Sequence, residues 1–131
     1  MNWSLNDKEI TTVLSLNGPA RYSYFIKRIS DWETIWSLFG TTGWALAADG
    51  AGRELVPVWP HEKYAERCAS GNWEGFAPKA IPLDAWLEKW IPGMTADKRL
   101  VAVFPTPNDK GLAVEPSRME GDLQRELSNY E

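Results

Sequence analysis

The spacing of apolar and polar residues predicts two helices in the first part of the chain. Asn6-Asp7 is suited to cap the first helix, and Asn17-Gly18 ends it. Pro19 suits the first turn of the second helix. The apolar residues of this second helix fall at i, i+3, i+4 and i+7, which predicts one buried face: Tyr22, Phe25, Ile26 and Ile29. Its other face is expected to carry the basic residues Arg21, Lys27 and Arg28.

Start and stop signals predict three further helices. The first covers 60–71 and turns Cys68 inward. The second begins at Asp84 and is expected to stop at Pro92-Gly93, because proline cannot continue the hydrogen-bond ladder of a helix. The third opens with a capping box over 117–120.

Six short segments rich in β-forming residues predict strands. Short Gly-rich turns join three of them and predict an antiparallel meander: 33–39, 44–48 and 54–59. The segment 79–82 is expected to be an edge strand, because Pro78 and Pro82 bracket it. The segments 100–104 and 112–114 flank a turn at 108–111, which predicts a hairpin.

Two of these strands have similar sequences. Leu55-Val-Pro-Val-Trp-Pro60 and Leu100-Val-Ala-Val-Phe-Pro105 are both apolar and both end in an aromatic residue followed by proline. The flanking residues do not match as a duplication would require. We therefore interpret the two segments as core strands that end in the same way.

The fold class that follows is α+β, with a single domain over 1–131. We expect a mostly antiparallel sheet of five to six strands, with four to five helices packed on one side and at the ends. The N-terminal helical segment, 1–17, is expected to be peripheral. The hydrophobic fraction of 44% is typical of a globular chain.

Composition and charge narrow the classes of function. A net charge of −4 disfavours nucleic-acid binding, which normally uses a basic surface. No apolar run approaches the roughly 20 residues of a membrane span, and the N-terminus lacks a signal-peptide pattern, so a cytoplasmic protein is expected. The single cysteine, Cys68, excludes an intramolecular disulfide. No group of residues has metal-ligand spacing, so we expect no metal and no cofactor.

The residues suited to catalysis are few. His61 and Cys68 lie seven residues apart, which is roughly 10 Å along a helix and too far for a thiolate–imidazolium pair. Cys68 is expected to be a small buried apolar residue. His61 follows a strand and starts a helix, where it is either solvated or able to donate to an anionic ligand. No residue is predicted to be catalytic.

Tryptophan is the most distinctive component of the chain, which contains eight: Trp3, Trp32, Trp36, Trp44, Trp59, Trp73, Trp86 and Trp90. Trp86 and Trp90 have the spacing of a core stripe on a helix. Trp73 lies in a polar loop flanked by glycines, where it either plugs the core or contacts a partner. The candidate binding face combines five residues: Trp44, Trp59, His61, Trp73 and Lys79.

Several segments resemble, in the same order, a bacterial family of small proteins, the domain of unknown function 2750. The segments are Arg21-Tyr-Ser-Tyr-Phe-Ile-Lys27, Asp31-Trp-Glu-Thr-Ile-Trp36, Gly43-Trp-Ala45, Val56-Pro-Val-Trp-Pro60, Lys79-Ala-Ile-Pro-Leu83, Trp86-Leu87, Val101-Ala-Val-Phe-Pro105 and Gly111. A fainter similarity in the order of elements links the chain to the N-terminal domain of SseB-type secretion-associated proteins. Neither resemblance implies an established activity.

Size, acidity and aromatic content favour a non-enzymatic protein-binding module of adaptor or immunity type. The alternative is a small-molecule-binding protein or an enzyme with a pocket lined by tryptophan and histidine. A homodimer is a third option, because exposed tryptophan also suits a two-fold interface. A deep, partly apolar pocket would favour the small-molecule alternative, and a flat aromatic patch would favour protein binding.

Overall fold

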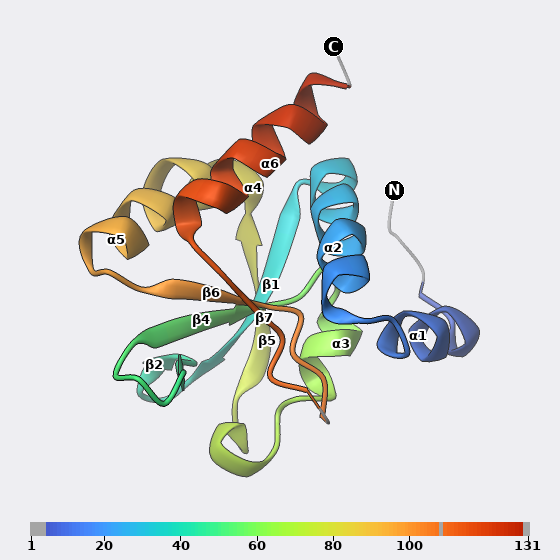
Figure 1. The fold of residues 1–131 in the computed structure, drawn as a ribbon. Coiled ribbons are helices and arrows are strands. Elements are labelled where there is room, and N and C mark those ends of the chain that lie inside the picture. Colours follow the sequence, from blue (N-terminus) through green and yellow to red (C-terminus); the bar gives the residue numbers. More distant parts are fainter. Residues whose placement is uncertain (1–4, 108, 130–131) are drawn as a thin grey trace.

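A computed structural model describes residues 5–107 and 109–129 and shows an α+β fold (Figure 1). Trp3 and Asn108 therefore lie outside the described residues. The helical segments are α1 (Asp7–Leu14), α2 (Gly18–Trp32), α3 (Glu62–Glu66), the 3₁₀ turn η1 (Gly71–Trp73), α4 (Leu83–Ala85), the π-helical η2 (Trp86–Trp90), α5 (Ile91–Ala96) and α6 (Pro116–Ser128). The strands are β1 (Thr34–Gly40), β2 (Gly43–Trp44), β3 (Ala47–Ala48), β4 (Glu54–Val58), β5 (Ala77–Pro82), β6 (Leu100–Val103) and β7 (Leu112–Val114).

The predicted cap of the first helix and the Pro19 start of the second are confirmed. Oδ1 of Asn6 accepts the N–H of Glu9 at 2.8 Å. Asn17, predicted to end the first helix, caps the second instead, where its Oδ1 accepts the N–H of Ala20 at 2.9 Å. Each bond satisfies one of the backbone donors that a helix leaves free in its first turn. The capping box predicted for α6 is wrong, because the N-cap is Glu115 and no side chain caps the helix.

The prediction that a helix stops at Pro92-Gly93 is also wrong. The helix continues through α4, η2 and α5 to Ala96. Pro92 has no N–H, so an α-helix would leave a backbone carbonyl one turn earlier without its donor. The chain widens into a π turn at this point, and the N–H of Ile91 reaches the carbonyl of Trp86 five residues back.

The strands form two sheets, so the prediction of a single sheet of five to six strands is wrong. One sheet has the order β2-β1-β5 and the other has the order β3-β4-β6-β7. The predicted strand 44–48 is divided between them, because Trp44 pairs with β1 whereas Ala47-Ala48 pairs with β4. The predicted meander is therefore interrupted inside its middle strand.

Pro57 explains why the two sheets separate. Trp36 of β1 and Trp59, which follows β4, exchange both backbone hydrogen bonds at 2.9 and 2.8 Å. The next pair of this antiparallel ladder would join Leu38 to Pro57, which has no N–H to donate. The carbonyl of Leu38 accepts the N–H of Ala45 instead, at 2.9 Å. The carbonyl of Pro57 accepts the buried hydroxyl of Ser37, at 2.6 Å.

The two similar segments are neighbouring parallel strands. β4 and β6 pair in register, with Leu55 opposite Leu100 and Val58 opposite Val103. The other strand pairs are antiparallel, as expected. Apolar residues on both faces are typical of parallel strands that are buried on both sides. The repeated sequence therefore corresponds to the two central strands of the larger sheet.

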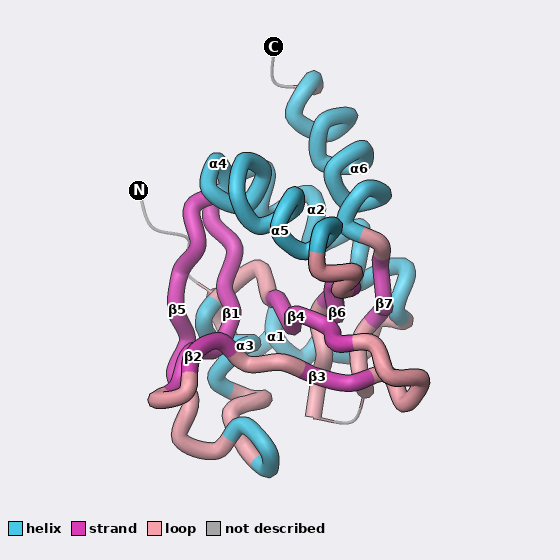
Figure 2. The backbone as a smooth tube through the Cα atoms, turned by 90° about the vertical axis from the view of Figure 1, so that its left-hand side faces the viewer, coloured by secondary structure: helices cyan, strands magenta, loops and turns pink. Residues whose placement is uncertain are grey.

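The two faces of this larger sheet have different surroundings. Valines of β4, β6 and β7 belong to the main core together with residues of α2 and α6. Leu55, Leu100 and Ala102 point the other way and form a small separate cluster with Ala47. Figure 2 shows α2, α4, α5 and α6 gathered on one side of the strands, with loops on the other side. Helices thus cover one face of the sheet.

β5 is the edge strand that was predicted, and its prolines have a positional reason. The backbone N–H and C=O groups of Trp36 point toward Trp59. The residues on either side of it in β1 therefore point their backbone groups toward β5. Pro78, Ala80 and Pro82 therefore turn their backbone groups outward. Two of these three outward positions lack an N–H, which protects the edge from pairing with another chain.

The N-terminal segment makes specific contacts with the rest of the molecule. Leu5, Ile10 and Val13 are buried in the main core. The Tyr24 hydroxyl donates to the carboxylate of Glu9 at 2.6 Å, which links α2 to α1. That the segment is peripheral to the domain stays a prediction.

Candidate functional site

A groove of about 1050 Å³ lies over the loop-side face of the four-stranded sheet. We call it the sheet groove. Each strand of the sheet contributes one residue to its floor, namely Ala47, Leu55, Ala102 and Ala113. Leu46, Ser70, Asn72 and Trp73 line one wall, and the loop between β6 and β7 lines the other with Pro105, Thr106, Pro107, Asp109, Lys110 and Gly111. Ala48, Asp49, Glu54 and Cys68 complete the lining.

The groove exists because its floor residues are small. Three of the four are alanines, so the loops on either side rise above the sheet without side chains filling the space between them. Strand alternation places the larger valines of the same strands in the main core. The larger side chains of these strands thus face the helices, and the small side chains on the opposite face leave the space of the groove.

Trp73 holds the first wall in place. Its indole Nε1 donates to the carbonyl of Leu46 at 3.3 Å. Its ring meets the buried ring of Trp59 edge-on, with centroids 6.1 Å apart and an interplanar angle of 89°. Trp73 is half-buried and Leu46 is 37% exposed. Trp73 therefore packs on the core and also lines the groove, and its contact with a partner stays a prediction.

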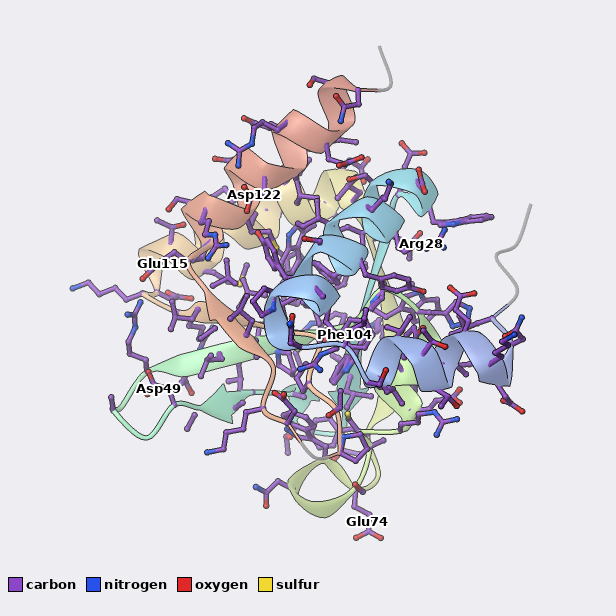
Figure 3. All side chains as sticks on the ribbon, turned by 45° about the vertical axis from the view of Figure 1, so that its right-hand side comes forward. Arg28, Asp49, Glu74, Phe104, Glu115 and Asp122 are labelled. Atoms are coloured by element: carbon purple, nitrogen blue, oxygen red, sulfur yellow. The ribbon has the colours of Figure 1, made fainter. Side chains whose placement is uncertain are left out.

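The second wall begins with an unusual backbone conformation. Phe104, which follows β6, has a φ of +59°, a left-handed conformation that an aromatic residue rarely adopts. Figure 3 shows Phe104 in the interior of the molecule. The carbonyl of Pro105 then accepts the indole N–H of Trp59 at 2.8 Å and the thiol of Cys68 at 3.4 Å. These contacts set the direction in which the loop leaves the sheet.

A buried arginine attaches this loop to α2. Arg21 is 3% exposed, which corrects its placement on the polar face of the helix. Its Nη2 lies 2.8 Å from Oδ2 of Asp109, and its Nη1 donates to the carbonyl of Leu16. Oδ1 of Asp109 accepts the N–H of Gly111 at 2.7 Å. The Arg21 guanidinium and the Gly111 N–H lower the pKa of the Asp109 carboxyl.

Asp49 lies at the rim of the groove, on the loop that follows β3 (Figure 3). Its Oδ1 accepts the N–H groups of Ala51 and Arg53 at 2.8 and 3.1 Å. These backbone bonds lower the pKa of the Asp49 carboxyl, so it is ionised at neutral pH. Glu54 at the same rim pairs with Arg99 at 3.1 Å.

The Cys68 thiol is buried, and the Nδ1 atom of His61 serves as a helix cap. Burial raises the pKa of the Cys68 thiol to about 11, so the thiolate form is scarce at neutral pH. This confirms Cys68 as a buried apolar residue. His61 caps α3, where its Nδ1 accepts the N–H of Lys63 at 3.1 Å. The groove can therefore bind through its shape, its charges and its hydrogen-bonding groups.

The five predicted site residues lie in three places. Trp73 lines the groove and packs against Trp59, which is fully buried behind it, and His61 caps the helix that follows. Trp44 and Lys79 lie on the smaller sheet. There Trp44 packs edge-on against Trp90 with centroids 4.8 Å apart, and Lys79 Nζ lies 5.4 Å from the Trp44 centroid.

Sequence reasoning missed the groove floor, because a single alanine carries no chemical signal. The alternation of Ala102 and Ala113 with valines was visible, but the strand order that brings these residues together was not. Arg21 and Asp109 were also missed. They are 88 positions apart in the sequence, and nothing local pairs them.

Two classes of site are not seen in the part of the chain that the structure describes. No helix there is both long and apolar enough to cross a membrane. Within residues 5–107 and 109–129, no three residues of the types His, Cys, Asp and Glu are grouped so that they could hold a metal ion.

A family model described as "Protein of unknown function (DUF2750)" matches residues 22–123. The match runs from the first turns of α2 into α6 and includes all the lining residues of the sheet groove. No curated protein matches the chain.

Proposed function

This chain belongs to the DUF2750 family, and because that description assigns no activity, we propose a function from the geometry of the sheet groove. The protein is a non-enzymatic binding module, of adaptor or immunity type, that receives a segment of a partner protein in this groove. The observation that carries the proposal is the small-residue floor of a sheet whose other face is covered by helices.

The outer strands of the groove floor support an occupant. On the central strands β4 and β6, the groove-side residues Leu55 and Ala102 are already buried, at 5% and 2% exposure. On the groove side, Ala113 of β7 is exposed and Ala47 of β3 is half-buried. A bound segment would supply the second layer that packs on this face.

The walls suit a polypeptide. Ser70, Asn72 and Thr106 offer hydroxyl and amide groups that can pair with backbone N–H and C=O groups. Trp73 offers an aromatic edge of the kind enriched at the centres of protein interfaces. Among the described residues, the one large apolar side chain that is exposed is that of Leu46. These residues therefore form no broad exposed aromatic patch.

A small-molecule ligand is the second candidate. The groove volume of about 1050 Å³ lies at the upper end of the range of ligand pockets. Its lining combines apolar and polar groups, which also fits this candidate.

The test compares two substitutions of exposed alanines by arginine. Ala113→Arg places a long side chain over the groove floor, and Ala80→Arg places the same side chain on the outer strand β5. Partners captured from the native host's lysate are identified, purified and titrated against each variant. We expect Ala113→Arg to weaken binding at least tenfold and Ala80→Arg to leave it unchanged. A partner that binds all three proteins equally would refute the groove as its site.

The same pair of variants tests the small-molecule candidate. A ligand that binds the groove raises the melting temperature of the wild type and of Ala80→Arg, but not that of Ala113→Arg. Stabilisation of all three proteins by the same ligand would place that ligand elsewhere.

A further inference from the structure

The charges along the sheet groove are unevenly distributed. Three carboxylates and one ammonium group line it, from Asp49, Glu54, Asp109 and Lys110. Asp49 and Glu54 are close together, because the N–H of Asp49 bonds to the carbonyl of Arg53 at 3.2 Å. Glu54 begins β4, whereas Asp109 and Lys110 lie in the loop that follows β6. Since β4 and β6 are parallel, these two groups lie at opposite ends of the strands.

Two of the carboxylates already have counter-charges. Glu54 lies 3.1 Å from Arg99, and Asp109 lies 2.8 Å from Arg21. Asp49 differs, because it accepts the backbone N–H groups of Ala51 and Arg53 and, among the described residues, forms no ion pair, although the charge of Arg53 also lowers its pKa. Arg53 directs its guanidinium to Glu115 at 3.1 Å. The negative charge of Asp49 is therefore available to an occupant of the groove.

The two ends are separated by a distance that an extended peptide spans easily. The four residues of β6 cover about 13 Å at the rise of a β-strand, and the sheet order places Asp49 and Lys110 two to three strand spacings apart, about 10–14 Å. Five or six extended residues can therefore run diagonally from Asp49 to Lys110 over the alanine floor. The net charge of −4 of the whole chain also favours encounter with a basic partner.

We infer that the occupant is an extended peptide segment of a partner protein that places a lysine or arginine at Asp49 and small or apolar side chains over the alanine floor. This inference rests on the proposed function. It adds the chemistry and direction of the segment: the cationic residue lies at the Glu54 end of the groove, and the rest of the segment runs toward Lys110.

A displayed library of random twelve-residue peptides, selected on the immobilised protein, tests this chemistry. Synthetic peptides made from the enriched sequences are then titrated by fluorescence polarisation against four variants. Ala113→Arg and Ala80→Arg report whether the peptide occupies the groove. Asp49→Asn removes one charge and keeps the Oδ1 acceptor, and Asp84→Asn is its matched control on α4, where Oδ1 accepts the N–H of Ala85.

We expect the enriched peptides to share a basic residue next to apolar ones. Their affinity should fall about threefold to fivefold in Asp49→Asn at low salt, the size of an exposed ion pair, and stay unchanged in Asp84→Asn. The difference should shrink as salt is raised.

The other outcomes separate the two proposals. Peptides that lose binding to Ala113→Arg but show no basic residue, or bind Asp49→Asn as tightly as wild type, overturn the charge inference and leave the groove in place. Peptides that bind Ala113→Arg as well as Ala80→Arg overturn both. A selection that enriches no sequence overturns the peptide as occupant and leaves the small-molecule candidate.

Discussion

Replacing Asp109 by asparagine is expected to destabilise the fold more than replacing Arg21 by methionine, although Arg21 is the buried member of the pair. The Arg21 side chain is 4% exposed and that of Asp109 is 46% exposed, with their charged atoms 2.8 Å apart. Asp109→Asn leaves a guanidinium that cannot lose its charge enclosed in protein. Arg21→Met leaves a carboxylate that water can solvate, and methionine fills most of the vacated volume.

The two magnitudes follow from this asymmetry. Removing one partner of a buried ion pair costs about 3–5 kcal/mol, and we take the lower end, about 3 kcal/mol, for Asp109→Asn because Asp109 is half-exposed. Arg21→Met loses an ion pair with an exposed partner and the charge-assisted bond to the Leu16 carbonyl, which together amount to about 2 kcal/mol. Asparagine at position 109 keeps an Oδ1 acceptor for the N–H of Gly111. The loss of stability in Asp109→Asn therefore measures the missing charge and not a missing hydrogen bond.

Urea denaturation followed by circular dichroism at pH 7 measures both free energies of unfolding. Asp84→Asn, an exposed aspartate with a similar backbone bond, is the control and should change stability by less than about 0.5 kcal/mol. If Arg21→Met costs as much as Asp109→Asn, an uncompensated buried charge does not explain the pair.

The pair also predicts a pH dependence. Arg21 holds the pKa of Asp109 in the folded protein below its ordinary value of 3.8. The interaction of Arg21 with Asp109 therefore stabilises the fold fully above pH 3.8. This stabilisation is lost as pH falls through the pKa of Asp109 in the folded protein. The stability difference between wild type and Asp109→Asn should narrow below about pH 3.8 and stay constant between pH 5 and 7. A difference that changes between pH 5 and 7 would identify another titrating group.

Three further predictions concern other parts of the fold. Cys68 should not react with a thiol reagent at pH 8 until the protein unfolds, because it is buried with a pKa of about 11; rapid labelling of the native protein would contradict this. Gly111→Ala should cost about 2–3 kcal/mol in urea denaturation, because its Cβ would lie 2.7 Å from the carbonyl oxygen of Val103 at a φ of +83°. Threonine at both Pro78 and Pro82 should produce concentration-dependent association in sedimentation experiments, since it restores two outward N–H groups; a strictly monomeric variant would show that the prolines do not protect this edge.

Local features of the chain were predicted well because their physics is local. The cap Asn6 satisfies a donor three residues away, Pro19 lies in the first turn of α2, and the two prolines that mark β5 as an edge act within their own strand. The buried state of Cys68 also followed from its residue type. The α+β class follows from such signals taken together.

Errors arose where a distant residue decided the outcome. The missing N–H of Pro57 ends the pairing of β4 with β1 and divides the predicted sheet, which depends on which strand lies beside it. Arg21 has the spacing of a solvent-facing residue on α2 and is buried because the loop carrying Asp109 covers it. The predicted binding face likewise joined Trp44 to Trp59, whereas in the fold Trp44 packs against Trp90 and Trp59 against Trp73.

The sequence by itself determined the starts of the first two helices, most of the strand segments, the edge role of β5, the inert cysteine and the family resemblance. These depend on backbone donors, turn residues and side-chain polarity within a few positions. Only the tertiary structure decided that the two similar strands lie side by side and that alanines from four strands form one floor. It also decided that Asp49 and Lys110 lie at opposite ends of the groove. The physical reason is that strand order and loop position depend on packing between segments far apart in the chain, and single residues carry no mark of that packing.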